Sequence, residues 1–186
     1  MIITNMKNVC FFVFFSIYCG GKLYSQNDFR EPSVNIGNTE FICKKSSGSY
    51  HVYDAANDTT PFRWEEGVEL LNIKLKSQRE FHAVFYDVFS PERLKELTES
   101  DVTLRVLFFI NKEGVLYQTN YSIPFDAKIK PSELVKLDSL MKQRFRFTTD
   151  EFYKKQYDKL FFSQPIRYSK IVNGEKIRPL DEWEYP

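Results

Sequence analysis

The chain has 186 residues, of which 42% are apolar, and it carries 26 basic and 25 acidic side chains. A chain of this length typically forms one domain, and its apolar content, with 18 phenylalanines, excludes an intrinsically disordered protein. The formal net charge of +1 lacks the basic excess that is typical of proteins that bind nucleic acid or anionic membranes.

The first 25 residues have the pattern of a secretory signal peptide. Lys7 supplies a positive charge, and an apolar run of about ten residues follows it over positions 9–18. A membrane-spanning helix needs about 20 apolar residues, so this run is too short to remain in a bilayer. We expect cleavage after Ser25, with cleavage after Gly21 as the alternative, and no transmembrane segment in the mature chain.

These features predict export to the periplasm or the cell surface. Cys19 follows the apolar run, so a lipoprotein is an alternative. It is the less favoured one, because Tyr18 stands where a lipid-attachment motif has a small residue. Only Cys43 remains after the signal peptide, so no intrachain disulfide is expected, and its apolar neighbours predict a buried thiol.

The mature chain is predicted to form one folded unit. The signal segment contains the basic residues Lys7 and Lys22 and no acid, which leaves 24 basic and 25 acidic residues and a net charge of −1. Residues 26–38 read as a polar lead-in, residues 39–180 as a single α+β domain, and residues 181–186 as an acidic, aromatic tail. The sequence leaves open whether the part before residue 91 is a separate subdomain.

The first half of the domain alternates between strand and helix patterns. Strands are predicted over 40–44, 50–54 and 68–75. Residues 81–89 then carry apolar side chains at helical spacing, and Ser77 followed by Glu80 forms a capping-box pattern before them.

The second half begins with a short helix over 91–98 and the strongest strand pattern, over 102–110. A tight turn at 111–114 leads to a return strand, and the helix after Pro131 carries an apolar stripe that ends at Phe145. The return strand is expected to place five side chains on one face: Val115, Tyr117, Thr119, Tyr121 and Ile123.

The last predicted strand spans residues 160–172. Pro165 lies inside it and indicates a sheet edge or a bulge, because proline cannot donate to a ladder. Asn173-Gly174 is read as a hairpin turn that leads into a short strand over 176–180. Together these elements predict an α+β fold in which helices pack on one face of an antiparallel sheet.

Several of these segments carry a family resemblance. They are the short helix that starts at Pro91, the strand and Asn-Lys-Glu-Gly hairpin over 102–115, the helix over 134–147, and the Phe-Phe-Ser-Gln-Pro-Ile-Arg-Tyr strand over 161–168. In this order they resemble the C-terminal domain of TonB-type proteins, which occurs in many exported proteins of Gram-negative bacteria. Asp101 departs from the pattern, because the family often has a glycine there.

The resemblance implies a β-β-α-β core and a way of binding, without energy transduction. In that family a sheet edge can pair with an extended peptide, so the strand over 160–172 is the candidate surface. The residues expected to contact an envelope protein or peptide are Phe162, Ile166, Arg167 and Tyr168, together with Trp183 and Tyr185 of the tail. Arg167 is expected to pair with a carboxylate of the partner.

Two alternatives to this non-enzymatic function stay open. A glycan-binding or adhesion module would present a row of exposed aromatic side chains that includes Trp64 and Trp183. A hydrolase would hold His51 or His82 beside an acid in a deep pocket. The sequence itself indicates no catalytic residue, no metal site and no cofactor, because neither histidine has the closely spaced ligands that a zinc site requires.

Overall fold

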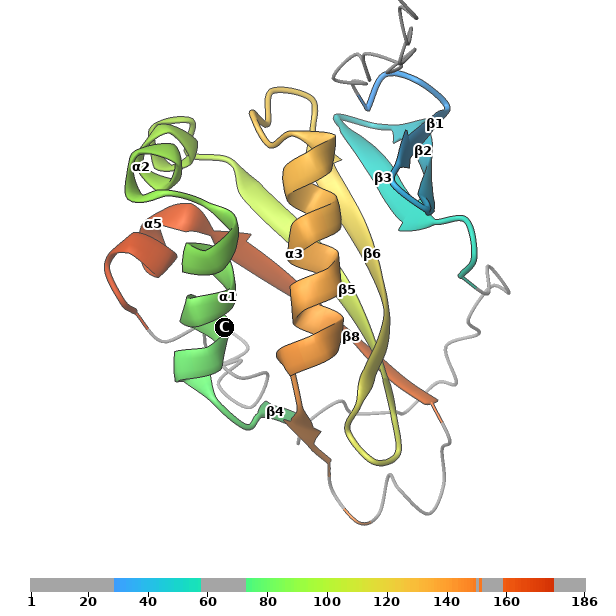
Figure 1. The fold of residues 1–186 in the computed structure, drawn as a ribbon, viewed down its shortest axis with the longest axis vertical. Coiled ribbons are helices and arrows are strands. Elements are labelled where there is room, and N and C mark those ends of the chain that lie inside the picture. The colour runs from blue at the N-terminus through green and yellow to red at the C-terminus, as the bar shows by residue number, and fades with distance from the viewer. Residues whose placement is uncertain (1–28, 58–72, 150, 152–158, 176–186) are drawn as a thin grey trace, which may run out of the picture.

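The computed structural model describes residues 29–57, 73–149, 151 and 159–175. Six strands form one antiparallel sheet in the order β1-β2-β3-β6-β5-β8, and helices lie on one of its faces (Figure 1). The fold is therefore α+β, as predicted. The strands are β1 (Ser33–Ile36), β2 (Thr39–Ser46), β3 (Ser49–Asp54), β5 (Thr103–Asn111), β6 (Leu116–Pro124) and β8 (Lys159–Arg167).

The helix layer is built from α1 (Gln78–Val88), α2 (Pro91–Glu99), α3 (Pro131–Arg144) and α5 (Tyr168–Val172). Serine side chains cap the first two helices. The Ser77 hydroxyl accepts from the Glu80 amide at 3.1 Å, and the Ser90 hydroxyl accepts from the Arg93 amide at 3.2 Å. Each bond satisfies one of the amides that a helix leaves unpaired in its first turn.

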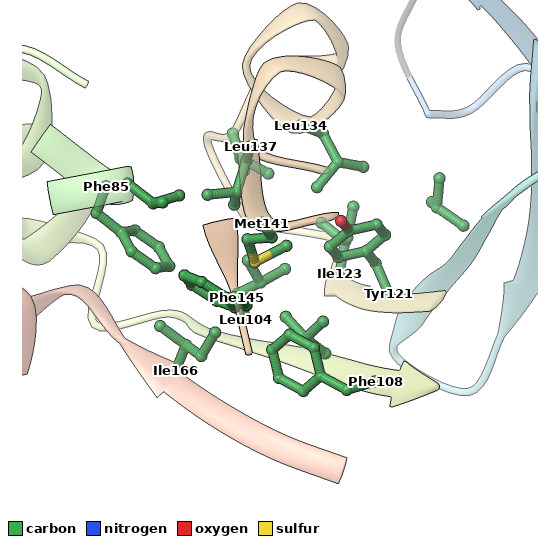
Figure 2. Packing of buried hydrophobic residues seen from close by; sticks show 14 of the residues in the cluster. Phe85, Leu104, Phe108, Tyr121, Ile123, Leu134, Leu137, Met141, Phe145 and Ile166 are labelled. Carbon is green, nitrogen blue, oxygen red and sulfur yellow. The ribbon is translucent and has the colours of Figure 1, made fainter. Parts of the chain in front are cut away.

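The core fills the space between α3 and the sheet. Figure 2 shows α3 side chains facing side chains of the strands, with Phe85 of α1 beside them. Aromatic rings pack against one another in it: the Phe81 and Phe145 ring centroids lie 5.3 Å apart, and those of Phe108 and Phe162 lie 5.2 Å apart. Burying such large apolar side chains is the main favourable contribution to folding.

The first three strands, β1 to β3, belong to the same sheet as β5, β6 and β8. β3 pairs with β6 from Ser49↔Pro124 to Tyr53↔Asn120, which joins the N-terminal strands to the second half of the domain. The polar lead-in prediction was wrong for its last part, because β1 lies inside it and pairs with β2. Phe29 and Val34 of this segment are buried, so the lead-in contributes to the core.

The return strand contains a β-bulge, so the prediction that its five side chains share one face was wrong. Ile110 pairs with Leu116 and Phe109 pairs with Gln118, so Tyr117 has no opposite residue on β5. The extra residue reverses the alternation at this point. Tyr117 is exposed, whereas Tyr121 and Ile123 face the core as predicted.

A second small sheet pairs β4 (Lys74–Leu75) with β7 (Phe147–Thr148). β4 is the described end of the strand predicted over 68–75, and positions 68–72 lie outside the described residues. The sequence pattern had not predicted β7, which consists of only two residues.

The C-terminal strand is shorter than predicted. β8 ends at Arg167, and α5 follows because Tyr168 and Ile171 both turn into the core. The hairpin predicted at Asn173-Gly174 was also wrong, since the amide of Glu175 donates back to the Lys170 carbonyl at 2.9 Å and closes α5. The strand predicted over 176–180 lies outside the described residues. None of the helices in the described part of the chain has the length and apolar content needed to cross a membrane.

Candidate functional site

The surface predicted to bind a partner is an edge of the main sheet. β8 pairs with β5 over nine positions, from Thr103↔Arg167 to Asn111↔Lys159, and is the last strand in the sheet order. Its position agrees with the edge indicated by Pro165.

The direction of the β8 backbone groups follows from the alternation of hydrogen bonds across the sheet. The Phe125 amide donates to the Gly48 carbonyl at 3.3 Å between β6 and β3. Successive residues of an antiparallel strand bond to opposite neighbours. The odd-numbered residues of β6 near Tyr121 therefore bond to β3, and the even-numbered ones bond to β5. The registers then place the even-numbered residues of β5 and of β8 in hydrogen bonds with each other. The backbone groups of Ser163 and Arg167 therefore point away from the sheet.

Pro165 interrupts this outward row. Its nitrogen carries no hydrogen, and the side-chain amide of Gln164 donates to its carbonyl oxygen at 3.1 Å. This position thus offers no donor to a partner strand, and its carbonyl oxygen is already engaged by a side chain. Proline on an edge strand is a common protection against uncontrolled edge-to-edge pairing. A partner strand at this edge would bond on either side of Pro165 and not across it.

Two arginines lie beside this interruption, on the sheet face that the helices do not cover. Arg105 of β5 is opposite Pro165, and Arg167 of β8 is opposite Thr103, so the two guanidinium groups are diagonal neighbours. Both side chains are exposed. Nη1 of Arg105 donates to the Ser163 hydroxyl at 3.4 Å, and neither arginine forms a salt bridge with an acid in the described part of the chain.

Most of the predicted contact residues do not form this surface. Phe162, Ile166 and Tyr168 are 5%, 0% and 3% exposed, because the even-numbered side chains of β8 and the first residue of α5 face the helices. Arg167 is exposed as expected, whereas Trp183 and Tyr185 lie outside the described residues.

The sequence reasoning missed Arg105. Its signal was a single charged residue within the most apolar strand of the chain.

The Tyr168 hydroxyl is buried without a hydrogen-bond partner. It lies near the ion pair in which Arg93 Nε contacts Glu133 Oε1 at 2.7 Å and Nη2 contacts Oε2 at 3.0 Å. Burial, and secondarily the charge of Glu133, raises the pKa of Tyr168 far above its usual range. A small apolar hollow lies beside this tyrosine, but it is too narrow to hold a water molecule.

A second buried polar group joins β6 to α3. The carboxylate of Asp138 is 6% exposed and accepts from the hydroxyls of Thr119 and Tyr121, the latter at 2.8 Å. Its other oxygen lies 2.8 Å from Nζ of Lys142. Burial first, and then the negative charge of Asp138, raises the pKa of Tyr121 well above 10. These groups satisfy one another, so the cluster acts as a structural link.

The residues on which catalysis would rest are arranged for structural roles. His82 Nε2 lies 2.9 Å from the Glu175 carbonyl oxygen, and His51 is exposed on β3. Cys43 is buried, and burial raises the pKa of its thiol to about 11, which disfavours the reactive thiolate. Among the described residues, no three His, Cys, Asp or Glu side chains form a group that could hold a metal ion.

Comparison with known proteins shows a shared fold. The chain is similar to the crystal structure of a DUF5043 family protein from Bacteroides uniformis ATCC 8492, with a TM-score of 0.59 and 14% sequence identity. The similarity covers 73% of this chain and 84% of that chain. No protein-family model and no curated protein matches the sequence. At this identity the likeness establishes the fold alone.

Proposed function

We propose that this protein is an exported, non-enzymatic interaction domain of the cell envelope. It binds an extended, carboxylate-bearing segment of a protein partner by strand addition along β8. The observation that carries this proposal is the position of β8 at the end of the sheet, with the backbone groups of Ser163 and Arg167 directed outward. Such groups supply affinity when a peptide adds to a sheet edge.

The chemistry of the partner follows from the two arginines. Arg105 and Arg167 are diagonal neighbours on one face, and like charges in this arrangement favour an anionic ligand. A guanidinium group binds carboxylate through two parallel hydrogen bonds, which adds geometric selectivity to the charge. Because Pro165 closes the middle of the edge, the bound segment pairs with it in two short stretches.

Two features of the sequence support this function. The TonB-like segments include β5, β6, α3 and β8, and in that family the sheet edge is a peptide-binding surface. The signal-peptide pattern in the first 25 residues supports export to the periplasm or surface.

A selection from random short peptides tests the proposal on the mature chain. The selected peptide is titrated calorimetrically, and amide hydrogen exchange then locates its contact strand. The decisive variant is Ser163→Pro, which removes an outward-facing amide without breaking a backbone hydrogen bond to β5, although it also removes the hydroxyl that accepts from Arg105. The matched control is Asn35→Pro on β1. The Cys43 amide donates to the Pro32 carbonyl, so by alternation the Asn35 amide also faces outward.

The proposal predicts that Ser163→Pro weakens the selected peptide at least tenfold, whereas Asn35→Pro leaves its affinity unchanged. Arg167→Gln should weaken acidic peptides and spare their neutral analogues. Selection of no peptide, protection at β1 instead of β8, or equal affinities for the two proline variants would each overturn the proposal.

The alternatives receive less support from the described residues. Tyr117 is exposed near the start of β6 and Phe125 is exposed just after its end, about 25 Å away at the usual rise of a strand, so they form no glycan platform together. Trp64 and Trp183, on which that alternative depends, lie outside the described residues. A glycan array screened in parallel with the peptides tests it directly.

A further inference from the structure

The small β4–β7 sheet presents a basic face to solvent. Leu75 pairs with Phe147, and Phe147 is buried. Side chains alternate along a strand, so the flanking positions point the opposite way. The Lys76 amide donates to the Arg146 carbonyl at 2.9 Å, which extends the register by one position. The outward face therefore carries Lys74, Lys76, Arg146 and Thr148, all of them exposed.

Lys76 and Arg146 stand directly opposite each other, and like charges in such a pair repel. Two other cations, at the C-terminal end of α3, have acidic partners. Lys142 pairs with Asp138, and Arg144 pairs with Asp87 at 2.5 Å. Neither Lys76 nor Arg146 forms a salt bridge with a carboxylate in the described ranges. Nη1 of Arg146 donates to the Phe145 carbonyl at 2.7 Å. This bond uses only part of the donor capacity of the guanidinium group.

We propose that this basic face binds the acidic C-terminal tail of the same chain, residues 181–186. The tail reads Asp-Glu-Trp-Glu-Tyr-Pro and supplies three carboxylates within four positions. Its two aromatic residues add a second kind of contact, because lysine and arginine cations are attracted to the faces of aromatic rings.

The place where the described chain ends supports this occupant. The Glu175 carbonyl oxygen lies 2.9 Å from His82 Nε2, one turn inside α1. From His82 back to Lys76 the chain covers about 13 Å, at the usual rises of a helix and an extended strand. Asp181 is six residues beyond Glu175, and six extended residues can span up to about 20 Å. The tail is therefore long enough to place its carboxylates on the basic face.

The test compares charge-reversal variants of the mature full-length chain by amide hydrogen exchange of the tail. In the unaltered chain the tail amides should exchange at least several-fold more slowly than in a free peptide of the same sequence, and high salt should abolish the difference. Lys76→Glu combined with Arg146→Glu should restore the rates of the free peptide. The matched control, Arg105→Glu with Arg167→Glu, reverses two exposed charges at the β8 edge and should leave the tail rates unchanged.

Zero-length carbodiimide cross-linking identifies the occupant independently. Cross-links from Lys74 or Lys76 to Asp181, Glu182 or Glu184 within one chain support the proposal. Cross-links to the carboxylates at positions 65 and 66, or to a second copy, would identify another occupant and overturn it. Loss of tail protection in the arginine variant alone would place the tail at the β8 edge, and would overturn this inference without contradicting the proposed function.

Discussion

The hydroxyl of Tyr121, in the middle of β6, donates a hydrogen bond of 2.8 Å to Oδ1 of Asp138 on α3. Figure 2 shows the tyrosine oxygen turned toward that helix. Both groups are buried, and the Thr119 hydroxyl donates to the same carboxylate oxygen. Because an unpaired polar group would be costly here, this cluster favours one position of α3 over the sheet.

Replacing each of the two buried tyrosines with phenylalanine is predicted to change the free energy of unfolding in opposite directions. Tyr121→Phe removes a bond to a carboxylate and should lower the free energy of unfolding by about 1.5–3 kcal/mol. Tyr168→Phe removes a hydroxyl that has no partner and should leave stability unchanged or raise it by up to about 1 kcal/mol. Urea denaturation of both variants checks the contrast. An equal loss of stability in the two would contradict the assigned hydrogen bonding.

Substitutions in the cluster around Asp138 are predicted to have non-additive effects on the free energy of unfolding. Asp138→Leu removes the acceptor that the two hydroxyls share and should cost about 3 kcal/mol or more, because the Tyr121 hydroxyl stays buried without an acceptor even though Thr119 can still donate to the Tyr121 oxygen at 3.0 Å. Adding Thr119→Val and Tyr121→Phe removes those hydroxyls as well. The triple variant should therefore be more stable than Asp138→Leu alone, as measured by urea unfolding. A triple variant that loses the sum of the single effects would show that the three groups act independently.

The helices and central strands were predictable because local and tertiary preferences agree there. Phe81, Val84 and Phe85 form one helical face, and the Ser77 cap lies where its pattern predicts. Pro165 likewise predicted an edge strand, since a proline is excluded from the middle of a sheet.

The failures lie where tertiary packing overrides local pattern. The bulge at Tyr117 lies next to a turn whose Gly114 carbonyl accepts from the amide of Phe147, a residue remote in the sequence. Tyr168–Val172 was predicted as the end of the last strand but folds as one helical turn, because Tyr168 and Ile171, three residues apart, then reach the core together. At the candidate site the edge was predictable, whereas the direction of each β8 side chain required the register with β5.

A side chain at Gly114 is predicted to be strongly destabilising, because it would overlap the backbone of Phe147. Gly114 has a φ of 77°, its carbonyl accepts from the Phe147 amide at 2.8 Å, and a Cβ there would overlap the Phe147 carbonyl oxygen. Gly114→Ala should destabilise by about 3 kcal/mol or more. The control is Gly48→Ala, because Gly48 has a φ of 76° but open space around it, so only the backbone cost of about 1–2 kcal/mol applies. Similar losses for both variants in thermal unfolding would contradict the close packing at Gly114.

Stability at high pH is predicted to fall because buried groups, among them Cys43 and Tyr121, hold their protons more tightly in the folded state. Burial raises the pKa of Cys43 from 9.0 to about 11, and burial with the charge of Asp138 raises the pKa of Tyr121 well above 10. The stabilisation from a raised pKa is complete below the unfolded value and is lost as the pH rises toward the folded value. The free energy of unfolding should therefore decline from about pH 9 upward, and Cys43 alone should contribute about 2 kcal/mol of that loss by about pH 11. In urea titrations at a series of pH values, Cys43→Ala should reduce the decline of the unfolding free energy above about pH 9, whatever its effect at neutral pH. An unchanged decline in that variant would show that the thiol ionises as readily in the folded chain as in the unfolded one.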